Sequence, residues 1–191
     1  MIDYDLPTSV NVGGVDYEIR ADYRAALDIL AALSDPELTD DDRAAVALGI
    51  FFVEDLPADL DILQEALDKC FWFISGGDEK SNDKPSPRLV DWEKDFRWIA
   101  SPINKMLGQD IRALKLHWWT FLSLYYEIGD CTFAQIVKIR NAKARGKKLD
   151  KTDREWARQN ADLVNIGTRY TKAEESLLTA WTKGGGSEHA E

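Results

Sequence analysis

The stretch LKLHWWTFLSLYYEI, residues 114–128, is the most densely apolar segment of this 191-residue chain. At helical spacing, one face of the segment carries Leu114, Trp118, Phe121, Tyr125 and Ile128. Much of the remaining circumference is covered by Trp119, Leu122 and Tyr126. A helix that is apolar nearly all round lies either at the centre of a core or under a partner. The segment therefore predicts a mainly α fold, with this helix in the core or at an interface.

Amphipathic patterns on both sides of that segment predict further helices. The patterns begin at or near Tyr23, Thr39, Pro57, Trp92, Phe133 and Thr152. Thr152 opens the capping-box sequence TDRE, so we expect it to cap the last of these helices. The chain is therefore expected to form a bundle of about six to seven helices.

A β-hairpin is expected before the first helix. Apolar residues alternate with polar ones around Gly13-Gly14, a pair that readily forms a two-residue turn. This turn would set Val12 opposite Val15 and Val10 opposite Tyr17. Because a lone hairpin is marginal in water, it must pack on its own helices or add to the sheet of another chain.

Charge is distributed unevenly along the chain, whose net charge is −10. Residues 1–87 hold 20 Asp and Glu against 6 Lys and Arg, a balance of −14, and residues 88–191 hold 14 against 18, a balance of +4. The segment 76–87 contains no apolar side chain except its prolines. We therefore expect an acidic hairpin-plus-helices lobe at 1–75, a polar linker or loop at 76–87, an aromatic-rich basic helical lobe at 88–182 and a flexible tail at 183–191.

Several classes of protein are disfavoured by composition. No apolar run approaches the roughly 18–20 residues that a bilayer span needs, and we expect no membrane partner. Two cysteines cannot build a disulfide framework, and the acidic start of the chain lacks the pattern of a signal peptide, which favours the cytoplasm. The net charge argues against a protein whose whole surface binds nucleic acid.

A search for chemistry finds no catalytic, cofactor-binding or metal-binding set. The two histidines, His117 and His189, lie in the aromatic segment and in the expected tail. No zinc spacing, phosphate-binding loop or nucleophile motif is present. Asp91 and Asp95 lie one helical turn apart, a spacing that is routine on solvated faces. We therefore expect a protein that is not an enzyme and requires no cofactor.

A basic run at 138–158 holds nine Lys and Arg against three Asp and Glu. Such a run could neutralise nucleic-acid phosphates, yet no known nucleic-acid-binding signature accompanies it. Cations near the C-terminus of a helix also stabilise the helix dipole, and Gly146 is expected to end the helix that carries the first of them. The alternative is an electrostatic contact with an acidic protein surface, such as the acidic half of another copy.

Adjacent tryptophans offer a second kind of contact. On a helix, Trp118 and Trp119 project about 100° apart, so one can face the core while the other meets a partner, or both can be buried in the monomer. The candidate partner-binding residues are four aromatic and six basic ones: Trp118, Trp119, Tyr125, Tyr126, Lys138, Arg140, Lys143, Arg145, Lys147 and Lys148.

The second half of the chain resembles one known family. The likeness is carried by DWEKDF at 91–96, LHWWTF at 116–121, GDCTF at 129–133, Ile139-Arg140 and GKKL at 146–149, and it covers about residues 88–160. The family comprises small proteins of long-tailed phages and prophages of Gram-positive bacteria, encoded near the tape-measure gene and taken to be tail assembly chaperones.

This resemblance implies a partner and a location. A tape-measure protein is a very long helical chain whose apolar stripes stay exposed until subunits of the tail tube protein enclose them. A helical chaperone would cover those stripes transiently by helix-in-groove packing, and would also bind itself as a homo-oligomer. It would act in the cytoplasm of the bacterial host and be absent from the mature virion. A minor structural or connector protein that stays in the virion is a further alternative.

Overall fold

The computed structural model describes residues 5–78 and 87–167. Within them, the hairpin is followed by eight α-helices and one short 3-10 helix. The elements are β1 (Ser9–Val12), β2 (Val15–Glu18), α1 (Tyr23–Leu33), α2 (Asp40–Phe51), α3 (Leu60–Ile74), α4 (Trp92–Leu107), η1 (Ile111–Ala113), α5 (Trp118–Tyr126), α6 (Thr132–Ala144), α7 (Lys151–Gln159) and α8 (Ala161–Val164). The mainly α fold with an N-terminal hairpin is thus confirmed.

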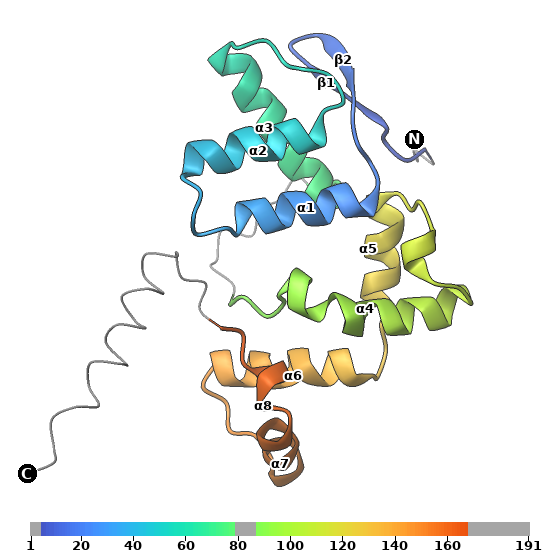
Figure 1. Ribbon diagram of the computed structural model, residues 1–191, viewed down its shortest axis with the longest axis vertical. Helices are drawn as coiled ribbons and strands as arrows, with labels where there is room; N and C mark the ends of the chain where they lie inside the picture. The colour runs from blue at the N-terminus through green and yellow to red at the C-terminus, as the bar shows by residue number, and fades with distance from the viewer. Residues whose placement is uncertain (1–4, 79–86, 168–191) are drawn as a thin grey trace, which may run out of the picture.

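The elements follow one another along the length of the molecule. Figure 1 shows the hairpin and α1–α3 at one end, α4 and α5 in the middle, and α6–α8 at the other end. One large apolar core joins the first two parts and includes Phe51, Phe73, Ile99, Trp118 and Phe121. A second, small cluster of buried apolar residues lies among α6, α7 and α8.

The hairpin has the predicted register and packs on its own chain. Val12 pairs with Val15 and Val10 with Tyr17, and the side chains of Val10 and Val12 are buried. The turn lies so close to α3 that a Cβ at Gly13, where φ is +58°, would come within 2.4 Å of a methyl group of Ile62. Only glycine tolerates both this φ and this approach.

The central apolar segment is helical over a shorter stretch than its pattern predicts. Residues 114–117 are not helical, because their backbone pairs with the chain before α1. Tyr23 N–H donates to the Leu116 carbonyl at 2.9 Å, and Trp118 N–H donates to the Ala21 carbonyl at 2.7 Å. His117 caps the helix instead of lying inside it, since its Nδ1 accepts the Trp119 N–H at 3.1 Å. Long-range pairing of the backbone therefore overrides the local helical pattern.

The start of α7 also differs from the prediction. The capping residue is Asp150, not Thr152, and its carboxylate accepts the Asp153 N–H at 2.7 Å. An aspartate at this position is as good a cap as threonine and adds a charge that favours the helix dipole. The predicted stop at Gly146 is confirmed, with φ at +63°.

The division of the chain into two lobes at 76–87 remains a prediction. The large core draws residues from both sides of that segment, including Phe73 before it and Ile99 after it. Residues 79–86, most of the predicted linker, lie outside the described residues, as do 168–182 and the predicted tail at 183–191. None of the described helices combines the length and apolar composition that a bilayer crossing needs.

Candidate interaction surfaces

The adjacent tryptophans of α5 close the C-terminal end of α3. Trp118 Nε1 donates to the Ile74 carbonyl at 3.0 Å, and Trp119 Nε1 donates to the Phe73 carbonyl at 2.8 Å. The last carbonyls of a helix have no partner within the helix, and Trp118 satisfies the one at Ile74. The Phe73 carbonyl accepts the Gly76 N–H at 3.1 Å as well as the Trp119 indole. Trp118 is buried, and Trp119 is partly buried, with its ring stacked on Phe73. Both tryptophans are therefore engaged within the chain.

The two tyrosines at the end of α5 differ in exposure. Tyr125 packs against Trp92 and Phe133, and burial raises the pKa of its hydroxyl to about 12. The side chain of Tyr126 is 73% exposed. Of the four aromatic candidates, Tyr126 offers the largest free surface to a partner.

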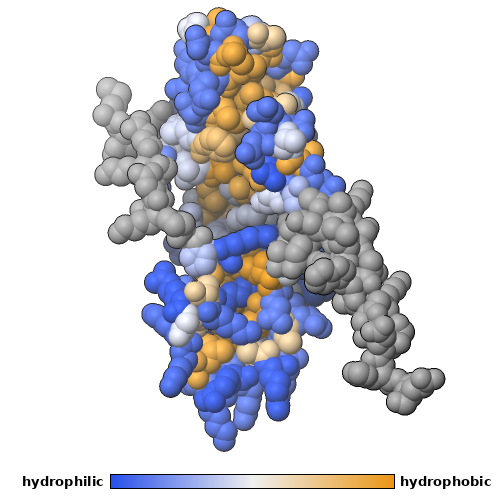
Figure 2. Space-filling view, turned by 90° about the vertical axis from the view of Figure 1, so that its left-hand side faces the viewer, coloured by the Kyte–Doolittle hydropathy of each residue, from blue (hydrophilic) through white to orange (hydrophobic). Residues whose placement is uncertain are grey.

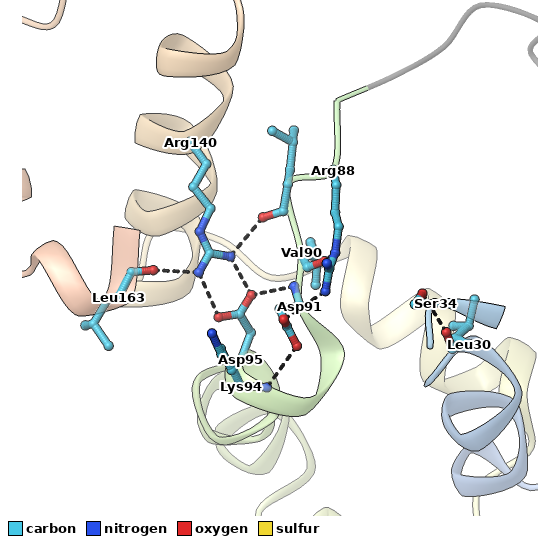
Figure 3. Close-up of polar contacts among 10 residues, drawn as sticks. Leu30, Ser34, Arg88, Val90, Asp91, Lys94, Asp95, Arg140 and Leu163 are labelled. Atoms are coloured by element: carbon cyan, nitrogen blue, oxygen red, sulfur yellow. Dashed lines mark hydrogen bonds and ion pairs between the residues drawn. The ribbon is translucent and has the colours of Figure 1, made fainter. Parts of the chain in front are cut away.

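Arg140 lies inside the protein, apart from the other basic candidates. Its guanidinium forms an ion pair with Asp95, with Nη1–Oδ2 at 2.5 Å and Nη2–Oδ1 at 3.1 Å. The remaining donors reach three backbone carbonyls, those of Leu89, Leu163 and Val164. Every N–H of the guanidinium thus has an acceptor within the chain. Figure 3 shows the contacts of Arg140 with Asp95 and Leu163. Arg140 joins α4, α6 and α8 and is 5% exposed.

Asp91 and Asp95 continue this network, and the interpretation of their spacing as a solvated face is wrong. Both residues are 2% exposed. Asp91 caps α4 by accepting the Lys94 N–H, and it forms an ion pair with Arg88 at 2.8 Å. Asp95 also accepts the Asp91 N–H at 2.9 Å. The sequence could indicate Asp91 as a helix cap, but the arginine that pairs with Asp95 lies 45 residues away.

The other basic candidates surround the end of α6. Lys138 forms an ion pair with Asp153 at 3.0 Å, and its pKa is raised by that carboxylate. Lys143 Nζ donates to the Asn165 side chain at 3.3 Å. Arg145, Lys147 and Lys148 are exposed around the Gly146 turn. Of the nine Lys and Arg at 138–158, Arg140 is the only buried one, so the run forms an exposed basic surface apart from that residue.

An apolar groove lies between α2 and α3, and none of the partner-binding residues predicted from the sequence lines it. Its volume is about 620 Å³. Apolar lining residues are Leu48, Phe52, Val53, Leu56, Leu60, Leu63 and Leu67, and Leu60 is 84% exposed. Three acidic residues, Asp41, Glu54 and Asp55, also line it, against one cation, Arg20. The sequence predicts α2 and α3 as two amphipathic helices. It does not predict how far apart the two helices pack, so the groove between them could not be predicted.

Hydrophobic surface is concentrated at the same end of the molecule. Figure 2 shows a band of hydrophobic side chains down the upper part, which is built from the hairpin and α1–α3. The lower part is mostly polar on this face. The acidic half of the chain thus combines negative charge with accessible apolar surface, a combination suited to binding a partner.

A comparison with known protein families finds a match. A family model described as Bacteriophage Gp15 protein matches residues 2–166, most of the chain. The chain belongs to this bacteriophage family. The match confirms the phage origin that the resemblance of the second half implies, and it extends over the hairpin and the acidic helices as well. No curated protein and no solved structure matches the chain.

Within the described part of this Gp15-family chain, no group of three or more His, Cys, Asp or Glu residues is placed to hold a metal ion. The two cysteines lie in different environments. Cys70 of α3 is buried, and burial raises the pKa of its thiol to about 12, whereas Cys131 before α6 is partly exposed.

Proposed function

We propose that this protein is a phage tail assembly chaperone that transiently binds the tape-measure protein, and other copies of itself, in the host cytoplasm. Membership of a bacteriophage family supports the setting. The motifs at 91–96, 116–121 and 129–133 resemble those of tail assembly chaperones and support the role. The observation that carries the proposal is the apolar groove between α2 and α3.

The groove has the chemistry that helix-in-groove recognition requires. Leu63 and Leu67 are half-buried along its wall, and Leu60 projects at its end with most of its surface in water. An amphipathic helix binds such a surface by laying its apolar stripe between two helices. A tape-measure protein would offer many such stripes along its length. Carboxylates in the lining favour stripes that are flanked by Lys or Arg.

The small size of the groove favours transient binding of the tape-measure protein. A surface built from parts of two helices is small beside the roughly 1,600 Å² of a stable protein–protein interface. Each contact would therefore be weak, and several copies bound along one tape-measure chain would give the required avidity. Tail tube subunits could then displace the copies one at a time.

Co-expression with the tape-measure protein of the same phage tests the proposal. We expect the tape-measure protein to become more soluble and to co-purify with this chain. Leu60→Asp should abolish both effects, because it places a carboxylate on the apolar surface and near the acidic lining residues. The matched control is Val46→Asp, which changes an exposed residue of α2 outside the groove. Failure to co-purify together with failure to improve solubility would refute the chaperone function.

A second experiment separates the chaperone from a structural connector. A chaperone leaves before the tail is complete, so mass spectrometry of purified virions should not detect this chain. Its presence in virions at a fixed copy number would favour the connector.

The exposed cluster of Arg145, Lys147 and Lys148 favours nucleic-acid binding as the second candidate. This candidate predicts retention on DNA or RNA that decreases with salt and is lost when Lys143, Arg145, Lys147 and Lys148 are changed to Glu. Two cations of the basic run, Lys138 and Arg140, are paired with carboxylates, which reduces the charge available to phosphates. Absence of salt-dependent retention would eliminate this candidate.

A further inference from the structure

A channel of about 940 Å³ lies between strand β1 and helix α3, on the side of the hairpin away from β2. We propose that it binds an extended segment of a partner protein, which adds to β1 as a third strand and places basic and apolar side chains over α3. This site is separate from the α2–α3 groove, and its partner is an extended chain, not a helix.

The backbone of β1 has the hydrogen-bonding groups that such an addition requires. In an antiparallel pair, alternate residues direct their N–H and C=O groups toward the partner strand or away from it. Ile19 N–H donates to the Thr8 carbonyl, so Thr8, Val10 and Val12 direct these groups toward β2. Ser9 and Asn11 therefore direct theirs outward, and both residues line the channel and are exposed.

The opposite edge of the hairpin is already occupied by this chain. Val53 N–H donates to the Glu18 carbonyl at 3.1 Å, and Arg20 N–H donates to the Phe51 carbonyl at 2.8 Å. The guanidinium of Arg20 binds the carbonyls of Gly49 and Ile50 beside them, each at 2.9 Å. Of the two edges of the hairpin, β1 is therefore the one available for strand addition among the described residues.

The opposite wall of the channel determines the chemistry of the added strand. Helix α3 and the residues after it contribute Glu65, Asp68 and Asp78 to the lining, against one cation, Lys69. Phe71, which is 44% exposed, and Trp72 supply apolar surface. Because side chains alternate along a strand, every second residue of the segment would face this wall. Basic and apolar residues at those positions complement it.

The channel is held open by contacts at the tip of the hairpin. Gly13 N–H donates to the Glu65 carboxylate at 3.0 Å, and the Ile62 side chain lies directly under the turn. These contacts fix the distance of β1 from α3 without using the outward groups of Ser9 and Asn11. The strand edge is thus formed before a partner arrives, which lowers the entropy lost on binding.

The test uses the full chain and the peptide acetyl-Thr-Lys-Thr-Val-Thr-Lys-Thr-amide, in which Lys and Val alternate with Thr. Peptide binding is followed by nuclear magnetic resonance, and we expect the amide hydrogens of Ser9 and Asn11 to exchange more slowly in the complex. The same peptide with Glu in place of Lys should bind about tenfold more weakly. Added salt should weaken only the Lys peptide.

A pair of proline variants isolates the strand edge. Asn11→Pro removes an outward N–H of β1 and should weaken binding about tenfold. Asp16→Pro removes the outward N–H of the paired residue on β2 and should change affinity less than about twofold. Both variants lose the same side-chain hydrogen bond, from Asn11 Nδ2 to Asp16 Oδ1 at 2.7 Å, so they are matched in that respect.

Two outcomes would overturn the proposal. Equal weakening by both proline variants would mean that peptide binding does not use the β1 edge. If Ser9 and Asn11 already exchange slowly in the free protein and the Lys peptide does not bind, a segment of this chain itself occupies the edge. Neither result depends on whether the tape-measure protein is bound.

Discussion

The hairpin and α1–α5 share one extended apolar core, which Phe133 at the start of α6 also joins. The rest of α6, with α7 and α8, packs around a small apolar cluster and one buried arginine. In the large core, the aromatic rings form two series of contacts, one through Tyr23 and Phe121 and the other through Phe51 and Phe73. The small cluster contains Ile139, Ala157 and Val164 as its buried members. Stability is therefore spread over many residues at one end of the molecule and concentrated at Arg140 at the other.

The free-energy cost of burying two ions predicts how α6–α8 should respond to mutation. Moving a guanidinium and a carboxylate out of water costs several kcal/mol per ion, and their attraction offsets this only when the geometry is good. The pair of Arg140 and Asp95 has such geometry, with two parallel N–H···O contacts and further carbonyl acceptors. Removing one partner leaves the other buried and unpaired.

Arg140→Met should have the largest effect on stability, about 3–5 kcal/mol in the free energy of unfolding, because Asp95 is left as an isolated buried charge. Urea denaturation followed by circular dichroism measures it. Arg112→Met is the control, since Arg112 pairs with Asp110 at the surface, where an ion pair contributes little to stability.

A double variant distinguishes charge from packing in that result. Asp95→Leu with Arg140→Met replaces both ions by apolar side chains and should recover much of the lost stability. Similar losses for the single and the double variant would show that the carbonyl contacts of Arg140, and not its pairing with Asp95, hold α8 in place.

The two cysteines should differ in their rate of alkylation, because Cys70 is buried in the large core and Cys131 is partly exposed before α6. Because burial raises the pKa of Cys70 to about 12, its thiolate fraction at pH 8 is about 1,000-fold below that of an ordinary thiol. Iodoacetamide should therefore label Cys131 while Cys70 stays unmodified in the native protein, as measured by peptide mass spectrometry. In Arg140→Met, labelling of Cys70 at the rate of Cys131 would contradict a large core that is independent of α6–α8.

Trp119→Phe should lower the free energy of unfolding by about 1 kcal/mol, since it removes the hydrogen bond to the Phe73 carbonyl. Trp98→Phe is an informative control, because the Trp98 indole N–H is buried without a hydrogen-bond partner. Removing an unsatisfied donor relieves a desolvation cost, so thermal denaturation should show a smaller loss for Trp98→Phe. A larger loss there would mean that ring packing, and not the indole N–H, dominates at both positions.

The sequence predicted the hairpin register and the helices because these depend on local rules of turns, periodicity and caps. The Gly13-Gly14 turn and the stop at Gly146 are of this kind. It could not predict the pairing of residues 21–23 with 116–118, or of Asp95 with Arg140, because these contacts join residues far apart in the chain. For the same reason, the sequence could not predict which basic candidates are exposed. Arg140 and Lys143 lie one turn apart on α6, and Arg140 is buried because α4 and α8 pack against it.

The pH dependence of α7 should be the smallest effect. The pKa of Asp153 is lowered by hydrogen bonds from Gln135 and Lys138, which join α6 to α7. A lowered pKa means that the contact stabilises the fold above the ordinary aspartate pKa of about 3.9 and is lost as the pH falls through the lower folded value. Amide chemical shifts of α7 between about pH 6 and 2 should follow this titration. Asp153→Asn should reduce this dependence where α7 contacts α6 and leave the shifts of α3 unchanged. Parallel titration of α3 and α7 in the unmodified protein would instead show that acid loosens both ends together, and that the two regions are not separately held.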